Sequence, residues 1–113
     1  MAKTNAAFMS GIPELLVLRL LSRSEMYGYE LIRAIRLTSG ESIVLAEGVV
    51  YPTLHSLEGR GLLKAKEKPV SGRVRVYYRT TAKGARRLTQ LEQDWQRINN
   101  GVEAILRREL CLN

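Results

Sequence analysis

The side chains of this 113-residue chain that could do chemistry are mostly basic, and they cluster in one segment. From Arg60 to Arg87 there are ten basic residues and one acidic residue, Glu67. The other 85 residues carry eight basic and ten acidic side chains, so the chain's net charge of +7 belongs to this segment. Clustered charge of one sign is typical of phosphate contact, whereas a solvated surface mixes signs. The segment therefore predicts a polyanionic partner, most simply nucleic acid. Its basic residues are Arg60, Lys64, Lys66, Lys68, Arg73, Arg75, Arg79, Lys83, Arg86 and Arg87.

Residues that catalyse reactions or bind metals are scarce. The chain has one histidine (His55), one cysteine (Cys111) and one aspartate (Asp94). A zinc site takes about four Cys or His ligands, and nucleophilic triads and carboxylate pairs need partners that are missing here. We therefore expect no enzyme activity, no metal and no cofactor.

Composition and length favour a soluble cytoplasmic protein of one domain's size. A lone cysteine excludes an intrachain disulfide and is compatible with a reducing compartment. The longest apolar stretch, Ile12 to Leu21, is far shorter than the roughly 20 residues that span a bilayer. The first residues lack the layout of a signal peptide. No membrane association is expected.

Three helices are predicted to come before the centre of the basic segment. The first runs from Ile12 to Arg23, where Ser10 is a candidate N-cap and apolar residues cover most of the surface. The second runs from Tyr27 to about Leu37. The third begins near Gly48 or Val49, because a proline at Pro52 is tolerated only in the first turn, and it ends at Gly59-Arg60-Gly61.

A β-hairpin is predicted to follow, with strands from Leu62 to Lys68 and from Arg73 to Thr80. The turn between them would be Pro69-Val70-Ser71-Gly72. The second strand alternates between apolar and polar residues, which indicates one face toward the core and one toward water. Val74, Val76 and Tyr78 would share the first face, and Arg73, Arg75, Tyr77 and Arg79 the second.

The last segment is predicted to be one helix from Ala82 to about Leu110, capped by Thr81. Its apolar residues repeat at intervals of three and four, which is the a/d spacing of a heptad seam. Such a helix is roughly 40 Å long, more than a domain of about 80 residues can cover. The seam therefore predicts a dimer with a second copy of the chain. Its residues are Leu88, Leu91, Trp95, Ile98, Val102 and Ile105.

Three helices followed by a basic hairpin are the order of a winged helix-turn-helix domain. We expect a mainly α fold with a small β-hairpin, in which residues 1–80 form the DNA-binding domain and residues 81–113 the dimerisation helix of one compact unit. The third helix would enter the major groove, and the hairpin would lie along the backbone or minor groove. The candidate DNA-binding residues are Tyr27, Tyr51, Pro52, Thr53, His55, Ser56, Lys68, Arg73 and Arg75.

Several of these residues have more than one interpretation. Free backbone N–H groups at the start of the second helix could hold a phosphate near Tyr27, while Tyr29 is expected in the core. Because Val50, Leu54 and Leu57 must face inward, Pro52, His55 and Ser56 take the outer face of the third helix, with Tyr51 and Thr53 at its edges. Tyr51 fits groove contact and half-buried packing equally well. Trp95 fits either a packed seam or a platform for a flat aromatic ligand at the two-fold axis.

The chain resembles the PadR family of bacterial transcriptional regulators over most of its length, from Pro13 to Leu110. The resemblance rests on an ordered set of motifs with matching spacing. These are Tyr27-Gly28-Tyr29-Glu30-Leu31, Glu47-Gly48-Val49-Val50-Tyr51-Pro52-Thr53-Leu54, Leu57-Glu58-Gly59-Arg60-Gly61-Leu62, Gly72-Arg73, Tyr77-Tyr78-Arg79 and Thr81-Ala82-Lys83-Gly84.

The resemblance implies a winged-helix repressor that dimerises through its last helix and is released by a small molecule. The single terminal helix is similar to that of the compact subfamily, some members of which stack aromatic ligands on a tryptophan matching Trp95. The implied ligand-binding residues are Ala7, Leu15, Leu91, Trp95 and Asn99. The chain departs from the family at His55-Ser56, where a basic pair is usual, and at Thr80-Thr81, where Leu-Thr is common.

Two other classes of function stay open. A basic module that binds RNA would favour exposed aromatic residues for stacking, and on the basic face of the hairpin only Tyr77 is a candidate. A winged-helix dimer that binds a protein partner, with no ligand response, would not need so basic a segment. An enzyme is the least favoured class, since no nucleophile and base can be paired.

Overall fold

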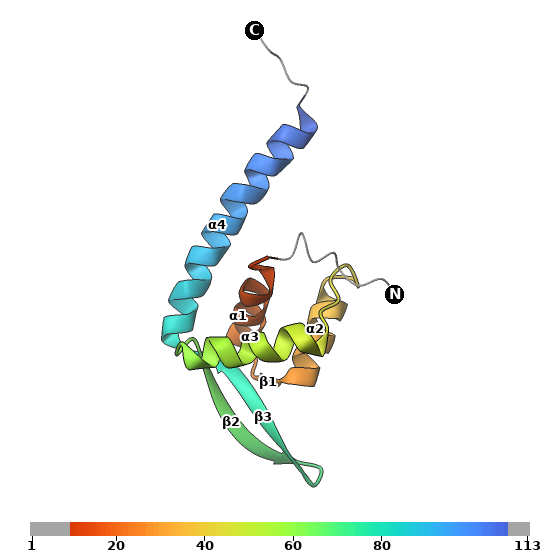
Figure 1. The fold of residues 1–113 in the computed structure, drawn as a ribbon, viewed down its shortest axis with the longest axis vertical. Coiled ribbons are helices and arrows are strands. Elements are labelled where there is room, and N and C mark those ends of the chain that lie inside the picture. Colours follow the sequence, from red (N-terminus) through yellow and green to blue (C-terminus); the bar gives the residue numbers. More distant parts are fainter. Residues whose placement is uncertain (1–9, 109–113) are drawn as a thin grey trace.

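The computed structural model describes residues 10–108, and its elements follow the predicted order. Three helices are followed by a hairpin and a long helix, so the predicted mainly α class with a small β-hairpin is confirmed. Figure 1 shows the hairpin and the last helix leaving the three-helix core in opposite directions. The elements are α1 (Ile12–Arg23), β1 (Met26–Tyr27), α2 (Gly28–Thr38), α3 (Glu47–Gly59), β2 (Leu63–Val70), β3 (Arg73–Thr80) and α4 (Ala82–Arg107).

The first three helices form the core because each buries one apolar stripe against the others. Their predicted bounds hold to within about two residues, but two details were wrong. The N-cap of α1 is Gly11, with a φ of 80°, and not Ser10. Helix α3 begins at Glu47, so Pro52 lies beyond its first turn and leaves the carbonyl of Gly48 without its helical partner. The buried set is Val17, Leu18, Leu21, Leu31, Ile35, Leu45, Val50, Leu54, Leu57, Leu62, Leu63, Tyr78 and Leu88.

The hairpin of β2 and β3, which we call the wing, belongs to a three-stranded antiparallel sheet of order β1-β3-β2. Its turn is only Ser71-Gly72, both with positive φ, which matches the twist of a two-residue hairpin. The longer predicted turn was wrong, because Pro69 pairs with Val74 within the sheet. A proline is tolerated there since β2 is an edge strand. Strand β1, of only two residues, was not predicted.

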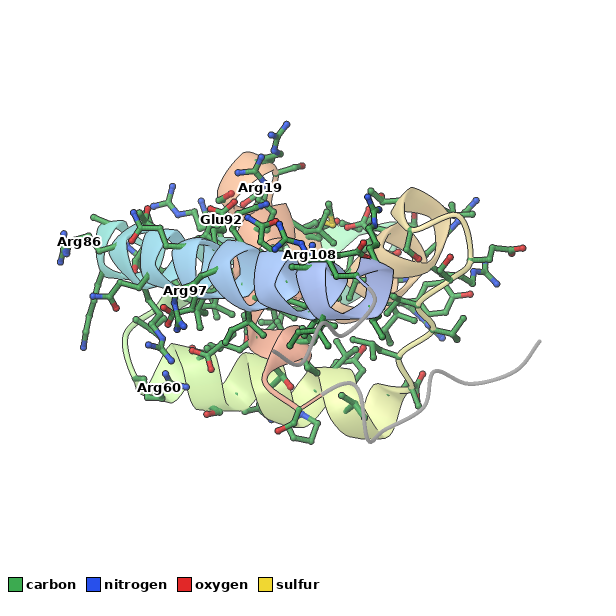
Figure 2. The ribbon with its side chains drawn as sticks, turned by 90° about the horizontal axis from the view of Figure 1, so that it is seen from above. Arg19, Arg60, Arg86, Glu92, Arg97 and Arg108 are labelled. Carbon is green, nitrogen blue, oxygen red and sulfur yellow. The ribbon has the colours of Figure 1, made fainter. Side chains whose placement is uncertain are left out.

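Helix α4 starts at the predicted cap, where the Gly84 amide donates to Thr81 Oγ1 at 3.0 Å. It ends at Arg107, while the expected end at Leu110 lies outside the described residues. The helix crosses α1, and Arg19 pairs with Glu92 across this contact at 3.6 Å (Figure 2). Among the described residues, no helix is both long enough and apolar enough to cross a lipid bilayer.

Candidate nucleic-acid interface

The antiparallel register gathers six cations on one face of the sheet. Directly paired residues point to the same side of an antiparallel sheet, and along each strand every second residue does. Lys64, Lys66 and Lys68 pair with Arg79, Tyr77 and Arg75, while Tyr27 of β1 pairs with Tyr77. We call this side of the sheet the basic face. It carries Lys64, Lys66, Lys68, Arg73, Arg75 and Arg79, together with Tyr27 and Tyr77.

The opposite face of the sheet meets the core only at the root of the wing. There Tyr78 is buried, and the Thr80 hydroxyl donates to the Leu18 carbonyl of α1 at 2.9 Å. Toward the tip, Val76 is exposed and Val74 is 67% exposed. The prediction of one face toward the core was therefore wrong for the outer half of the wing, because those residues extend past the helices.

Aromatic rings and cations alternate across the basic face. The Arg75 guanidinium lies 4.3 Å from the centre of the Tyr27 ring, and Lys68 Nζ lies 5.0 Å from that of Tyr77. The two tyrosine rings meet edge to face, 5.4 Å apart. Lys68 also pairs with Glu25, just before β1. These cation–π contacts hold two of the predicted DNA-binding cations in place on the wing.

The start of α2 bears on two sequence-based expectations. The backbone N–H of Tyr27 is not free for a phosphate, because it donates to Glu30 Oε1 at 3.2 Å. The expectation that Tyr29 lies in the core was wrong, since it is 60% exposed. The stripe that α2 buries consists of Gly28, Leu31 and Ile35, and this stripe turns Tyr29 outward.

Helix α3 presents the predicted outer face. Its buried stripe is Val50, Leu54 and Leu57, which leaves Pro52, His55 and Ser56 exposed. Tyr51 and Thr53 are half-buried at the two edges of this face. Pro52 and Ser56 are small, and His55 is the one larger side chain among these three.

Two contacts fix the edges of that face. The Tyr51 ring packs where Gly28 lacks a side chain, since a Cβ at Gly28 would lie 2.5 Å from it. The Thr53 hydroxyl donates to the Val49 carbonyl at 2.7 Å. Tyr51 therefore has a packing role in addition to any contact with a groove.

Two arginines of the basic segment share one carboxylate away from the basic face. Arg60 Nη2 and Arg87 Nε donate to the same oxygen of Glu14, at 3.0 and 3.1 Å. Burial raises the pKa of the Glu14 carboxyl, but the hydrogen bonds and charges of Arg87 and Arg60 outweigh it, and the net pKa is lowered. This carboxylate ties the start of α1 to the end of α3 and to α4.

The expected ligand-binding residues come together in part. A hollow of about 330 Å³ lies between the start of α1 and the middle of α4, and Leu15, Leu91 and Trp95 line it. Asn99 is half-buried but does not line this hollow, and Ala7 lies outside the described residues. Asp94 at its edge is the one charged side chain of the lining.

The seam of α4 is covered at its beginning and open beyond it. Leu88 is buried and Leu91 half-buried against α1, whereas Trp95 is 45% and Ile105 78% exposed in the single chain. Ile98 and Val102 between them are exposed as well. Across residues 10–108, no three His, Cys, Asp or Glu side chains gather as metal ligands would.

Four residues of the basic face are missing from the candidate DNA-binding residues, although the three cations belong to the predicted basic segment: Lys64, Lys66, Tyr77 and Arg79. The alternation of β3 already placed Tyr77 and Arg79 beside Arg75. The wrong turn length shifts the cross-strand partners of Lys64 and Lys66 by two residues but leaves both lysines on the same face. Glu25 was missed too, because nothing in its local pattern shows that it reaches Lys68.

Comparison with known proteins gives one consistent family. A model of the transcriptional regulator PadR-like family matches residues 17–90. Transcriptional regulator YqjI of Escherichia coli is 31% identical over 97 residues, which cover 86% of this chain and 45% of that protein. The crystal structure of a PadR family transcriptional regulator from Eggerthella lenta is similar with a TM-score of 0.79 at 30% identity, over 92% of this chain and 89% of that one. A PadR-like transcriptional regulator from Bacillus cereus gives the same TM-score and identity, over 91% and 99%.

Proposed function

Since the chain belongs to the PadR-like family of transcriptional regulators, we propose that it is a homodimeric, sequence-specific DNA-binding repressor of the cytoplasm, with no enzyme activity. The single observation that carries the DNA-binding part is the basic face, where six cations share one side of a sheet. A surface of one sign attracts phosphates strongly and fits no role in folding.

Two surfaces would share the work of DNA binding, which we assign to residues 1–80. The outer face of α3 would enter the major groove, where Thr53 and Ser56 can contact either base type. The wing would follow the backbone with Lys68, Arg73 and Arg75. Since α3 presents no arginine on its outer face, most of the affinity would come from the wing.

Dimerisation would use the open part of the α4 seam. Ile98, Val102 and Ile105 are apolar, regularly spaced and exposed in the single chain. A second α4 packed along this seam would bury them and close a two-fold dimer. The distance between the two α3 helices, and hence the half-site spacing, would follow from this contact.

A small planar aromatic effector is the further part of the proposal. The hollow beside Trp95 is lined largely by apolar side chains, and a partner helix would close its open side. A flat ring stacked on Trp95 would relieve repression by changing how the two halves of the dimer are held. Because Trp95 is the sole tryptophan, planar aromatic compounds that bind there should quench its fluorescence. Absence of quenching across such compounds would leave Trp95 a packing role only.

Replacing Arg73 and Arg75 with alanine tests the wing contact. The double variant should bind duplex DNA more weakly, and the slope of log affinity against log salt should become less steep by about one for each phosphate that is no longer bound. Arg97→Ala, which removes a charge from α4 far from the wing, is the control. Unchanged DNA affinity and salt slope in the double variant would refute the wing contact.

A further inference from the structure

The wing contains two directly opposed pairs of like charge. Lys64 pairs with Arg79 across the strands, and Lys68 pairs with Arg75. Directly opposed side chains on an antiparallel pair have their Cβ atoms about 5 Å apart, so like charges there destabilise the hairpin. Each pair therefore needs something that offsets the repulsion.

The repulsion in the pair nearer the tip, Lys68 with Arg75, is offset within the chain. Glu25 forms an ion pair with Lys68, and the Tyr27 ring lies against the Arg75 guanidinium. Tyr77 lies beneath the Lys68 ammonium. A carboxylate and two aromatic faces thus stabilise this pair of cations without any ligand.

The pair at the root of the wing has no such compensation. Within residues 10–108, no carboxylate oxygen lies within 4.0 Å of the charged nitrogens of Lys64, Lys66 or Arg79, and all three side chains are exposed. They border a hollow of about 500 Å³, whose other lining residues are Glu25, Ala65, Lys68 and Tyr77. The one carboxylate there, Glu25, is engaged by Lys68. The hollow keeps a net positive charge that folding does not explain.

We propose that Lys64, Lys66 and Arg79 form a phosphate-binding site at the root of the wing, which takes the backbone of duplex DNA outside the segment that α3 would read. Lys64 and Lys66 repeat at about 6.6 Å along β2. One DNA strand advances about 3.4 Å per phosphate along the axis and also turns around it, so two lysines at this spacing fit neighbouring phosphates of one strand. The site rests on the proposed DNA-binding function and enlarges its footprint.

The double variant Lys64→Gln with Arg79→Gln tests this site, because the proposal predicts opposite effects on stability and on binding. Removing the opposed charges should raise the midpoint of thermal unfolding, since the repulsion disappears. The same change should weaken binding to a random 40-base-pair duplex. Raising the salt from 50 to 200 mM should weaken the binding of both proteins. Because the variant contacts two fewer phosphates per bound chain, the affinity of the wild type should fall by a factor about ten times larger than that of the variant.

A comparison of sequences shows whether the site contacts backbone or bases. Binding is measured on the random duplex and on the DNA upstream of the protein's own gene. The variant should lose affinity for both by the same factor, so that the preference between them is unchanged. The control is Arg97→Gln, which removes one charge from α4 and should leave both affinities as they are. Glu25→Gln, which removes the carboxylate that competes with phosphate for Lys68, should strengthen binding to both duplexes.

Three outcomes distinguish a failure of the proposed phosphate site from a failure of the proposed DNA-binding function. Unchanged affinity and salt dependence in the double variant, with the preference for upstream DNA intact, would overturn the site and leave the regulator standing. A wild-type protein without that preference would contradict sequence-specific regulation, while the difference in salt dependence would still support the phosphate site. Single-stranded RNA that displaces the duplex from the wild type, but binds the double variant poorly, would make RNA the ligand and refute the DNA assignment.

Discussion

The Arg75 guanidinium of the wing lies 4.3 Å from the centre of the Tyr27 ring, at the start of α2. The Tyr27 ring in turn meets Tyr77 of β3 edge to face. The wing is therefore held to the helical core by side chains on its solvent side, in addition to the β1–β3 pairing. Two candidate DNA contacts, one at α2 and one on the wing, are coupled through this one ring.

That coupling can be measured with Tyr27→Ala and Arg75→Ala. Each single variant should weaken DNA binding, and the effects should be non-additive by about 0.5–1 kcal/mol, because either change removes the same cation–π contact. Tyr27→Phe keeps the ring and should preserve most of the coupling. Additive losses in the two alanine variants would show that the ring does not position Arg75.

Most of the fold could be predicted from the sequence because its elements carry strong local signals. Apolar stripes predict the bounds of α1, α2 and α3 to within a few residues, and the Thr81 cap predicts the start of α4. The turn of the wing was harder to predict, because the local sequence does not distinguish a proline within an edge strand, such as Pro69, from a proline in a turn. Strand β1 exists only through its pairing with β3, which no local pattern encodes.

Glu14 should make stability depend on pH. Its carboxyl pKa is held below the ordinary value of 4.5, so the contribution of its bonds to Arg60 and Arg87 is fully present above that value. It is lost as the pH falls through the lowered pKa. Glu14→Gln should reduce the free energy of unfolding by about 1 kcal/mol at pH 7, a modest value because both arginines are partly exposed.

Urea unfolding at pH 7 and at pH 3 checks this expectation. The difference between wild type and Glu14→Gln should be smaller at the lower pH, because it is lost as the pH falls through the lowered pKa. A difference of the same size at both values would show that the carboxylate's charge is not what stabilises this junction.

Gly84 is required where α4 passes over the root of the wing. A Cβ at this position would lie 2.1 Å from the Leu62 carbonyl oxygen, a backbone atom that cannot move aside alone. Gly84→Ala should cost about 1–3 kcal/mol of stability by thermal unfolding. Gly101→Ala, where nothing lies within 4 Å, should instead stabilise the helix by up to about 1 kcal/mol. Equal effects of the two substitutions would contradict the close approach.

Charges placed on the α4 seam should break the dimer. Trp95→Asp with Ile98→Asp puts two carboxylates on the surface that a partner helix would cover, and light scattering should then give the mass of a monomer. Gln93→Asp adds a carboxylate to an exposed position on the other side of the helix and should leave the mass unchanged. A well-folded dimer of the double variant would refute the seam.

The candidate site was predictable in its chemistry but only partly in its composition. Counting charges located the wing, and helical periodicity separated the inner from the outer face of α3. The pairing of Lys64 with Arg79 and the reach of Glu25 to Lys68 depend on register and side-chain conformation. The exposure of Tyr29 could not be predicted because it depends on which side of α2 is buried. The buried position at the start of this helix is occupied by Gly28, against the Tyr51 ring, and not by a larger side chain.

Binding of the purified protein to the DNA upstream of its own gene, compared with random DNA at two salt concentrations, tests the central claim most directly. The basic face and the outer face of α3 together predict tight binding that weakens steeply with salt and prefers the upstream DNA at both concentrations. Weak binding that is equal on both DNAs would contradict a sequence-specific regulator.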